Sequence, residues 1–160
     1  MIVENQKNIK VHFAACEVMN QFYAVEKLGI KYHLYTAFPF LERTVLKSKI
    51  SPIMPCHLKG FEYDIPKYIS SKSNHCIQDS GLFTLMFGSH KGQKDEKLMN
   101  AWYDGLVEFT LNNNNKATCV EVDCQKILGE EKAWEYRERF KKDIPNRIIN
   151  VFHKEDGQKG

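Results

Sequence analysis

Three residues that could do proton-transfer or hydrogen-bonding chemistry each come directly after a short run of β-forming residues: Asp79, Asp123 and His153. In parallel α/β folds, ligands bind at the carboxyl ends of the strands, whether the sheet is open or closed. Two carboxylates and one imidazole would therefore meet at the functional edge of a sheet. Such groups accept hydrogen bonds and act as general acids or bases.

Each residue also has a simpler interpretation. Asp79, followed by Ser80 and Gly81, could cap the next segment, because Asp and Ser side chains accept bonds from free backbone N–H groups. Asp123 could cap a helix in the same way, and a single histidine such as His153 is more often packed or exposed than functional. The coincidence of all three at strand ends favours the functional interpretation.

The elements that must position these residues alternate along the chain. This alternation predicts a parallel sheet of about five strands with covering helices, an α/β fold. It fits an open doubly wound sheet as well as part of a (β/α)8 barrel. No internal repeat or linker is evident, so residues 1–160 are interpreted as a single domain. Strands are predicted at residues 11–16, 31–38, 74–78, 117–122 and 147–152, helices at 17–28, 96–111 and 130–140, a connection with at most short helices at 41–68, and a loop at 83–94.

Composition limits the class of protein. The chain has 160 residues, of which 42% are hydrophobic and 27% charged, as in ordinary globular proteins. A net charge of +3 permits nucleic-acid binding without arguing for it. The polar segment Met1 to Lys10 has no signal-peptide pattern and no apolar run is long enough to span a bilayer, so we expect a cytoplasmic chain that does not enter membranes.

Several conspicuous side chains have structural interpretations. The five cysteines are an odd number at spacings that do not suit zinc, and we interpret Cys16, Cys76 and Cys119 as small buried apolar residues. The charged run at residues 126–142 is interpreted as a solvated helix face, with the two tryptophans in the core. The tryptophans are Trp102 and Trp134.

The segment from Asp79 to Phe83, Asp-Ser-Gly-Leu-Phe, resembles the Asp-Ser-Gly-Gly-Phe motif of the queuine/archaeosine tRNA-guanine transglycosylase family. It is even more similar to the shortened relatives of phages and DNA-modification clusters, which exchange guanine for a 7-deazaguanine in DNA. Residues 121–124 resemble the end of the family's fourth strand, and residues 148–156 the end of the fifth. The similarity spans residues 11–156.

The resemblance implies a (β/α)8 TIM barrel of which this chain would be the N-terminal part, truncated before closure. It implies a base exchange in DNA or tRNA, in which a carboxylate attacks the anomeric carbon, guanine leaves and a 7-deazaguanine replaces it. The family's nucleophilic Asp and its zinc site lie later than Gly160, so the resemblance implies no cofactor or metal within this chain. It also implies a second polypeptide or a homo-oligomer that completes the barrel, or a truncated form.

The matching positions imply roles for individual residues. Asp79 matches the general acid/base, and Asp123 matches the carboxylate that reads the N1–H and exocyclic amine of the purine. His153 stands where tRNA-type relatives have a base-contacting Gln. The remaining matches are Ser80 and Gly81 in the base-pocket turn and Phe83 as an aromatic wall.

Two departures from the family pattern affect this turn. Leu82 replaces the second Gly of the motif, which restricts the backbone there. Thr84 stands where tRNA-type members have Gln.

Two other hypotheses stay open. The chain could be a non-catalytic partner subunit that binds a deazaguanine or nucleic acid. It could also be an unrelated small α/β enzyme, although the sequence has no nucleophile elbow and no phosphate loop.

Overall fold

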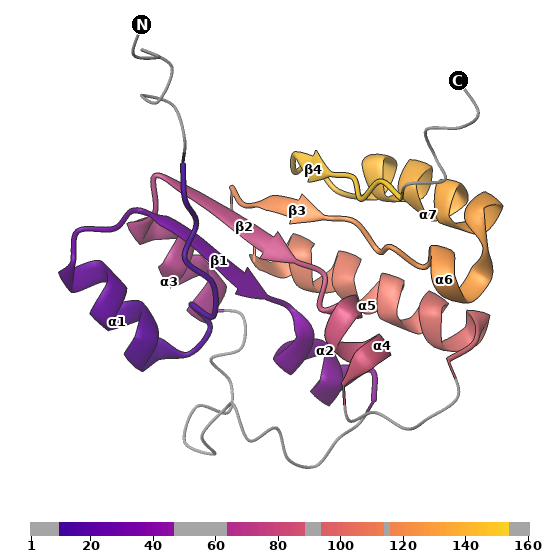
Figure 1. The fold of residues 1–160 in the computed structure, drawn as a ribbon, viewed down its shortest axis with the longest axis horizontal. Coiled ribbons are helices and arrows are strands. Elements are labelled where there is room, and N and C mark those ends of the chain that lie inside the picture. The colour runs from indigo at the N-terminus through magenta and orange to yellow at the C-terminus, as the bar shows by residue number, and fades with distance from the viewer. Residues whose placement is uncertain (1–9, 47–63, 89–93, 114–115, 154–160) are drawn as a thin grey trace, which may run out of the picture.

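Four parallel strands form the centre of the computed structural model, which describes residues 10–46, 64–88, 94–113 and 116–153. The strands lie side by side in the order in which they occur along the chain, and the sheet is not closed into a barrel (Figure 1). The protein is therefore an α/β fold with a singly wound parallel sheet. The strands are β1 (Tyr32–Thr36), β2 (His75–Asp79), β3 (Thr118–Val120) and β4 (Ile148–Ile149).

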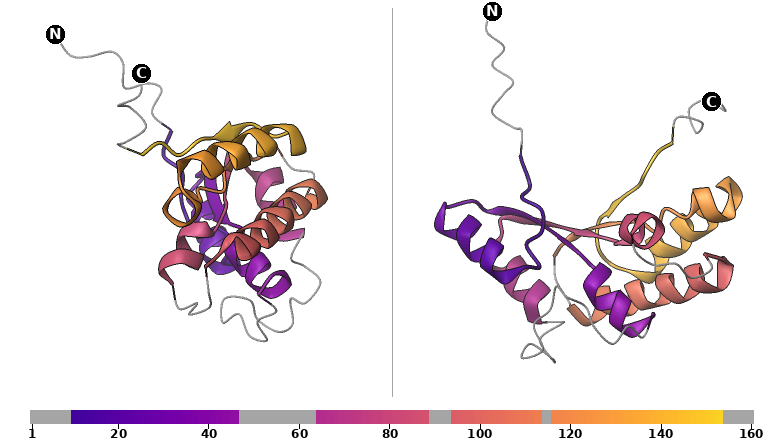
Figure 2. Two further views of the ribbon diagram at one scale, coloured as in Figure 1. Left: turned by 90° about the vertical axis from the view of Figure 1, so that its right-hand side faces the viewer. Right: turned by 60° about the horizontal axis from the view of Figure 1, so that its bottom comes forward.

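Seven helices precede or connect the strands in the described residues. In the right-hand view of Figure 2, α1, α3 and α5 lie on the same side of the sheet. The bounds are α1 (Met19–Lys27), α2 (Phe38–Thr44), α3 (Asp64–Lys72), α4 (Leu82–Phe87), α5 (Glu96–Asn113), α6 (Gln125–Leu128) and α7 (Glu130–Asp143).

Burial alternates along β1 and β2, as expected when one face of a sheet packs against helices. Buried His33 contacts the ring of Phe22 on α1, with 5.0 Å between ring centroids. Buried Tyr35 donates a hydrogen bond to Gln78, and Gln78 in turn donates to Thr110 on α5. The intervening residues of both strands are only half-buried, and they form the other face of the sheet.

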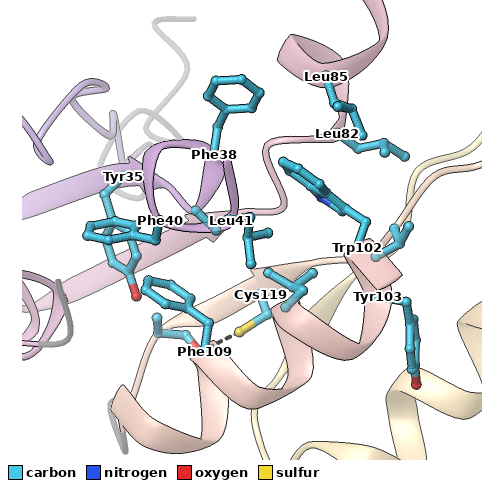
Figure 3. Packing of buried hydrophobic residues seen from close by; sticks show 14 of the residues in the cluster. Tyr35, Phe38, Phe40, Leu41, Leu82, Leu85, Trp102, Tyr103, Phe109 and Cys119 are labelled. Atoms are coloured by element: carbon cyan, nitrogen blue, oxygen red, sulfur yellow. Dashed lines mark hydrogen bonds between the residues drawn. The ribbon is translucent and has the colours of Figure 1, made fainter. Parts of the chain in front are cut away.

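The hydrophobic core lies between the sheet and the helices. Trp102 of α5 is fully buried, and its indole N–H donates to the carbonyl of Ser80 at 3.0 Å. Phe109 of the same helix stacks on Phe40 of α2, with 4.7 Å between ring centroids (Figure 3). The spacing of the buried residues of α5 confirms the amphipathic helix predicted at 96–111.

The cysteines interpreted as small apolar residues are indeed buried: Cys16, Cys76 and Cys119. Burial raises the pKa of the Cys16 thiol to about 11, and that of the Cys76 and Cys119 thiols to about 12. Thiols with such pKa values stay protonated and chemically inert. Cys56 lies outside the described residues.

The strand predicted at residues 11–16 was wrong in extent. Phe13 makes a single parallel bridge with His33, and Ala15 has a φ of 59°, which breaks the extended backbone. The strands predicted at 117–122 and 147–152 form, but as short pieces of three and two residues. The sheet therefore has four strands and one bridge in place of five strands.

Two helices were not foreseen. Residues 82–87, predicted as part of a loop, form α4 because Leu82 and Leu85 recur at helical spacing and are both buried. The four-residue helix α6 follows β3. Pro39 lies in the first turn of α2, where its missing N–H costs no hydrogen bond.

Gly81 is the residue that lets the chain turn from β2 into α4. Its φ is +72°, and a Cβ at this position would lie 2.7 Å from the backbone nitrogen of Phe38. Both the backbone conformation and the close approach of α2 therefore require glycine.

Replacing Gly81 with Ala should destabilise the fold by about 2–5 kcal/mol, because it adds overpacking to the left-handed backbone cost. Gly29 provides a matched control: its φ is +74°, but nothing lies within 4 Å of its Cβ position. Gly29→Ala should cost only about 1–2 kcal/mol. Urea denaturation of both variants checks the difference, and equal losses would contradict the proposed contact with α2.

Candidate functional site

A pocket of about 210 Å³ lies at the carboxyl ends of β2, β3 and β4. It is smaller than the ~300–1,000 Å³ of pockets for drug-sized ligands, so it suits a single ring system. Five of the six residues that the sequence predicts for the site line it. The lining residues are Asp79, Ser80, Leu82, Phe83, Met86, Phe87, Val120, Glu121, Asp123, Lys126, Val151 and His153.

Asp79, at the end of β2, is fixed by two hydrogen bonds to the same carboxylate oxygen. The hydroxyl of Thr36 and the backbone N–H of Gly81 both donate to its Oδ2, each at 3.0 Å. Asp79 therefore accepts a free backbone N–H of the turn, although no side chain of the described residues caps the N-terminus of α4, and this bond does not exclude a functional role. Among the described residues no hydrogen bond occupies Oδ1, so this atom stays available to a ligand in the pocket.

Asp123 and His153 form a pair on the other side of the pocket. The Nε2 atom of His153 lies 2.8 Å from one carboxylate oxygen of Asp123 and 3.0 Å from the other. Because an ionised carboxylate only accepts, Nε2 must carry the proton and donate it. A carboxylate has about four acceptor positions, so Asp123 can still accept bonds from a ligand. The Asp123 side chain is 27% exposed and that of His153 is 17% exposed.

In the turn that follows Asp79, some residues line the pocket and one has a purely structural role. Ser80 is buried and lines the pocket, while Gly81 is the one predicted site residue that does not line it. Phe83 lines the pocket but is 74% exposed, so it stands at the mouth. Leu82, which departs from the resembled motif, is buried in the pocket wall.

Sequence reasoning missed a buried ion pair behind the pocket. Nε and Nη2 of Arg137 on α7 each donate to Glu121 at 2.8 Å, and both side chains are less than 5% exposed. Nη2 also donates to the carbonyl of Val151, and the Val151 N–H donates to Glu121 at 2.7 Å. The pair therefore ties the chain after β4 to the end of β3. The only signal in the sequence is Glu121 inside an apolar strand, where a charge needs a partner.

The charged segment at residues 126–142 was therefore misinterpreted in part. Its exposed residues are solvated as predicted, but Arg137 is buried. Trp134, predicted as core, is 42% exposed and covers the guanidinium of Arg137, which lies 4.2 Å from the ring centroid. Phe152 lies on the same guanidinium at 5.3 Å. Arginine, unlike lysine, presents a planar cation that suits such stacking.

Glu17, a second residue that the sequence reasoning missed, lies behind Asp79. Its carboxylate accepts the backbone N–H of Thr36 at 3.3 Å. Burial and, to a smaller extent, the negative charge of Asp79 raise the pKa of Glu17 above its usual 4.5. A Glu with a raised pKa beside a site carboxylate marks a place where negative charge is concentrated.

Within the described ranges, no three His, Cys, Asp or Glu side chains are grouped as metal ligands. None of the helices in this part of the chain has the length and apolar character needed to span a bilayer. Comparison of the chain with models of protein families, with curated proteins and with solved structures finds no match. The assignment of a function therefore depends on the geometry of the pocket and on the residues themselves.

Replacing Glu121 with Gln should lower the free energy of unfolding by about 3–5 kcal/mol, because it leaves the charge of Arg137 buried without a counter-ion. Replacing both partners with apolar residues, as in Glu121→Leu with Arg137→Met, should cost less than the single change. Glu138→Gln, in an exposed pair with Lys141, is the control and should change little. A single variant as stable as the control would contradict the account of the buried pair.

Glu17→Gln should stabilise the protein near about pH 7. The raised pKa means that the fold favours the neutral form of Glu17. The stability that this side chain contributes is therefore present below pH 4.5, and it is lost as the pH rises through the pKa of Glu17 in the folded protein. The gain of the Gln variant should therefore disappear below about pH 4.5. Thermal unfolding across this range, with the exposed Glu108→Gln as control, measures the effect, and a gain independent of pH would refute it.

Proposed function

We propose that this chain carries the guanine-binding part of a transglycosylase of the queuine/archaeosine tRNA-guanine type, which exchanges guanine for a 7-deazaguanine base in DNA or tRNA. The observation that carries the proposal is the pocket in which Asp79 faces the Asp123–His153 pair. The three residues come from the ends of three neighbouring strands. The three residues lie far apart in the sequence, and a common site at the strand ends would explain why they line one pocket.

The strand order supports a partial (β/α)8 barrel over a doubly wound sheet. In a doubly wound sheet the strand order reverses at a switch point, whereas in a barrel each strand lies beside the next one along the chain. The four strands lie in sequential order without a reversal, and Phe13 adds its bridge on the outer side of β1. The half-buried face of the sheet would become the interior of the barrel.

The chemistry of the pocket suits a guanine-like base. The N1–H and the exocyclic amine of guanine are both donors, and a carboxylate can accept both at once, which is the role we propose for Asp123. His153, as a donor at Nε2, holds that carboxylate in orientation. Asp79 is the general acid/base, and its Oδ1 is the atom that exchanges the proton.

We assign the nucleophile to strands that would follow β4, because the resembled family carries it on a later strand. These strands would come from the same polypeptide, from a second polypeptide or from a second copy of this chain. They would also cover the open face of the sheet and the edge at β4, which an isolated sheet leaves unpaired.

A second candidate is a partner subunit that binds a deazaguanine or nucleic acid without catalysing the exchange. One observation favours it: Oδ2 of Asp79 already accepts bonds from Thr36 and Gly81, and so stabilises the turn into α4. Incubating DNA and tRNA with labelled guanine, in the presence of the completing chain, distinguishes the two. Asp79→Asn should abolish incorporation if the site is catalytic and leave it unchanged if the chain only binds.

Asp123→Ala should weaken guanine binding by the full chain about 5- to 150-fold, the equivalent of losing one bidentate base contact. Calorimetric titration with guanine and 7-deazaguanine measures it. Asp104→Ala, an exposed carboxylate on α5, is the control and should bind like the unaltered chain. Equal affinity of the Asp123 variant, or equal affinity of the unaltered chain for adenine and guanine, would refute the proposed role.

A further inference from the structure

Two large aromatic side chains stand in solvent at the mouth of the pocket. Phe83 is 74% exposed and Phe87 is 59% exposed, although both belong to a helix of six residues whose inner side is fully buried. Their ring centroids lie 4.8 Å apart, with 48° between the ring planes. Neither ring is needed for the core, since Leu82 and Leu85 are the residues by which α4 belongs to the buried core.

A cation lies beside these rings. The ammonium group of Lys126, an exposed residue of α6, is 5.6 Å from the ring centroid of Phe87. We call Phe83, Phe87 and Lys126 the aromatic shelf. All three residues also line the pocket that holds Asp79 and Asp123, so the shelf and the pocket are one continuous surface.

We propose that the aromatic shelf binds single-stranded DNA, with a nucleobase next to the target base stacked on Phe83 and Phe87 and a backbone phosphate on Lys126. The inference rests on the proposed function, because it requires that one base of a strand enters the pocket. The pocket, at about 210 Å³, has room for one base, and the neighbouring nucleotides must lie outside it. The shelf adjoins the pocket, and it offers the neighbouring nucleotides aromatic rings for stacking and a cation for a phosphate.

Exposed aromatic rings combined with a positive charge are the features of sites for single strands. Each ring accepts any base by its face, and stacking on an aromatic residue stabilises binding by ~1–3 kcal/mol per base. In a duplex the faces of the bases are covered by their neighbours, so a paired strand cannot use the rings unless a base leaves the stack. The shelf therefore selects unpaired nucleotides.

The shelf has no group that would favour ribose over deoxyribose. None of its three side chains has a hydrogen-bond acceptor group, since lysine only donates and phenylalanine has no polar atom. A ribose 2′-hydroxyl lying against the shelf would therefore gain no hydrogen bond to an acceptor of these side chains.

Fluorescence anisotropy of the full chain with labelled oligonucleotides of about eight nucleotides tests the proposal. We expect a single strand of thymidines to bind more tightly than a duplex and at least as tightly as a uridine strand of RNA. Phe87→Ala should weaken binding of the single strand about 5- to 150-fold. Lys126→Gln should reduce the slope of log affinity against log salt by about 0.7.

Two matched control variants remove an aromatic ring and a positive charge at positions outside the shelf. Tyr23→Ala deletes a 45% exposed aromatic ring from α1, and Lys27→Gln deletes an exposed charge from the end of the same helix. Both should bind the strand like the unaltered chain. Because Phe87 is exposed, its Ala variant should keep the circular dichroism spectrum of the fold, and Phe87→Leu provides a second variant that keeps an apolar side chain but no ring.

Four outcomes of the binding measurements would overturn the proposal: no binding of single strands, tighter binding of a duplex, tighter binding of RNA than of DNA, or an unchanged affinity in both Phe87 variants. Loss of self-association in the Phe87 variants on sedimentation, without any effect on DNA, would show that the shelf is a protein interface and would also overturn it. The thymidine strand contains no guanine, so its binding tests the shelf independently of the proposed function. If it binds through Phe87 while guanine does not bind, the shelf stands and the transglycosylase proposal fails.

Discussion

The buried ion pair between Glu121 and Arg137 is the contact on which the carboxyl edge of the sheet depends. β4 has only two residues in its ladder, too few to hold the chain that follows it. The two side chains supply the backbone hydrogen bonds that a neighbouring strand would otherwise make. The carboxylate of Glu121 accepts the N–H of Val151, and Arg137 donates to the Val151 carbonyl. Because both charges are almost completely buried, they can exist only as a pair. His153, two residues further on, is placed by this contact.

The two sides of the pocket are thus held by different means. Asp123 and His153 depend on the ion pair and on the contacts of the Trp134 and Phe152 rings with its guanidinium. Asp79 depends instead on backbone geometry, through the left-handed turn at Gly81 and the hydroxyl of Thr36. Rigid support on both sides of a small pocket is the arrangement that a site for a flat, polar ring requires.

The parts of this structure that the sequence predicts are those governed by local pattern. The long helix α5 and the strands β1 and β2 follow from hydrophobic periodicity, and polar residues at three strand ends predict that they meet at one edge. The burial of Arg137 could not be predicted, because a buried arginine within a charged helix has the same local sequence as a solvated one. Its partner Glu121 lies sixteen positions away. The helix α4 was missed because six residues are too few for a periodic signal, and residues 11–16 form only a bridge because of the backbone at Ala15.

We propose that Asp79, Asp123 and His153 surround one guanine-sized base, and a crystal structure of the chain with guanine is the decisive experiment. We expect guanine in the pocket, with N1–H and the exocyclic amine donating to Asp123 and the ring edge facing Oδ1 of Asp79. Guanine bound elsewhere, or bound in the pocket without contact to Asp123, would contradict it.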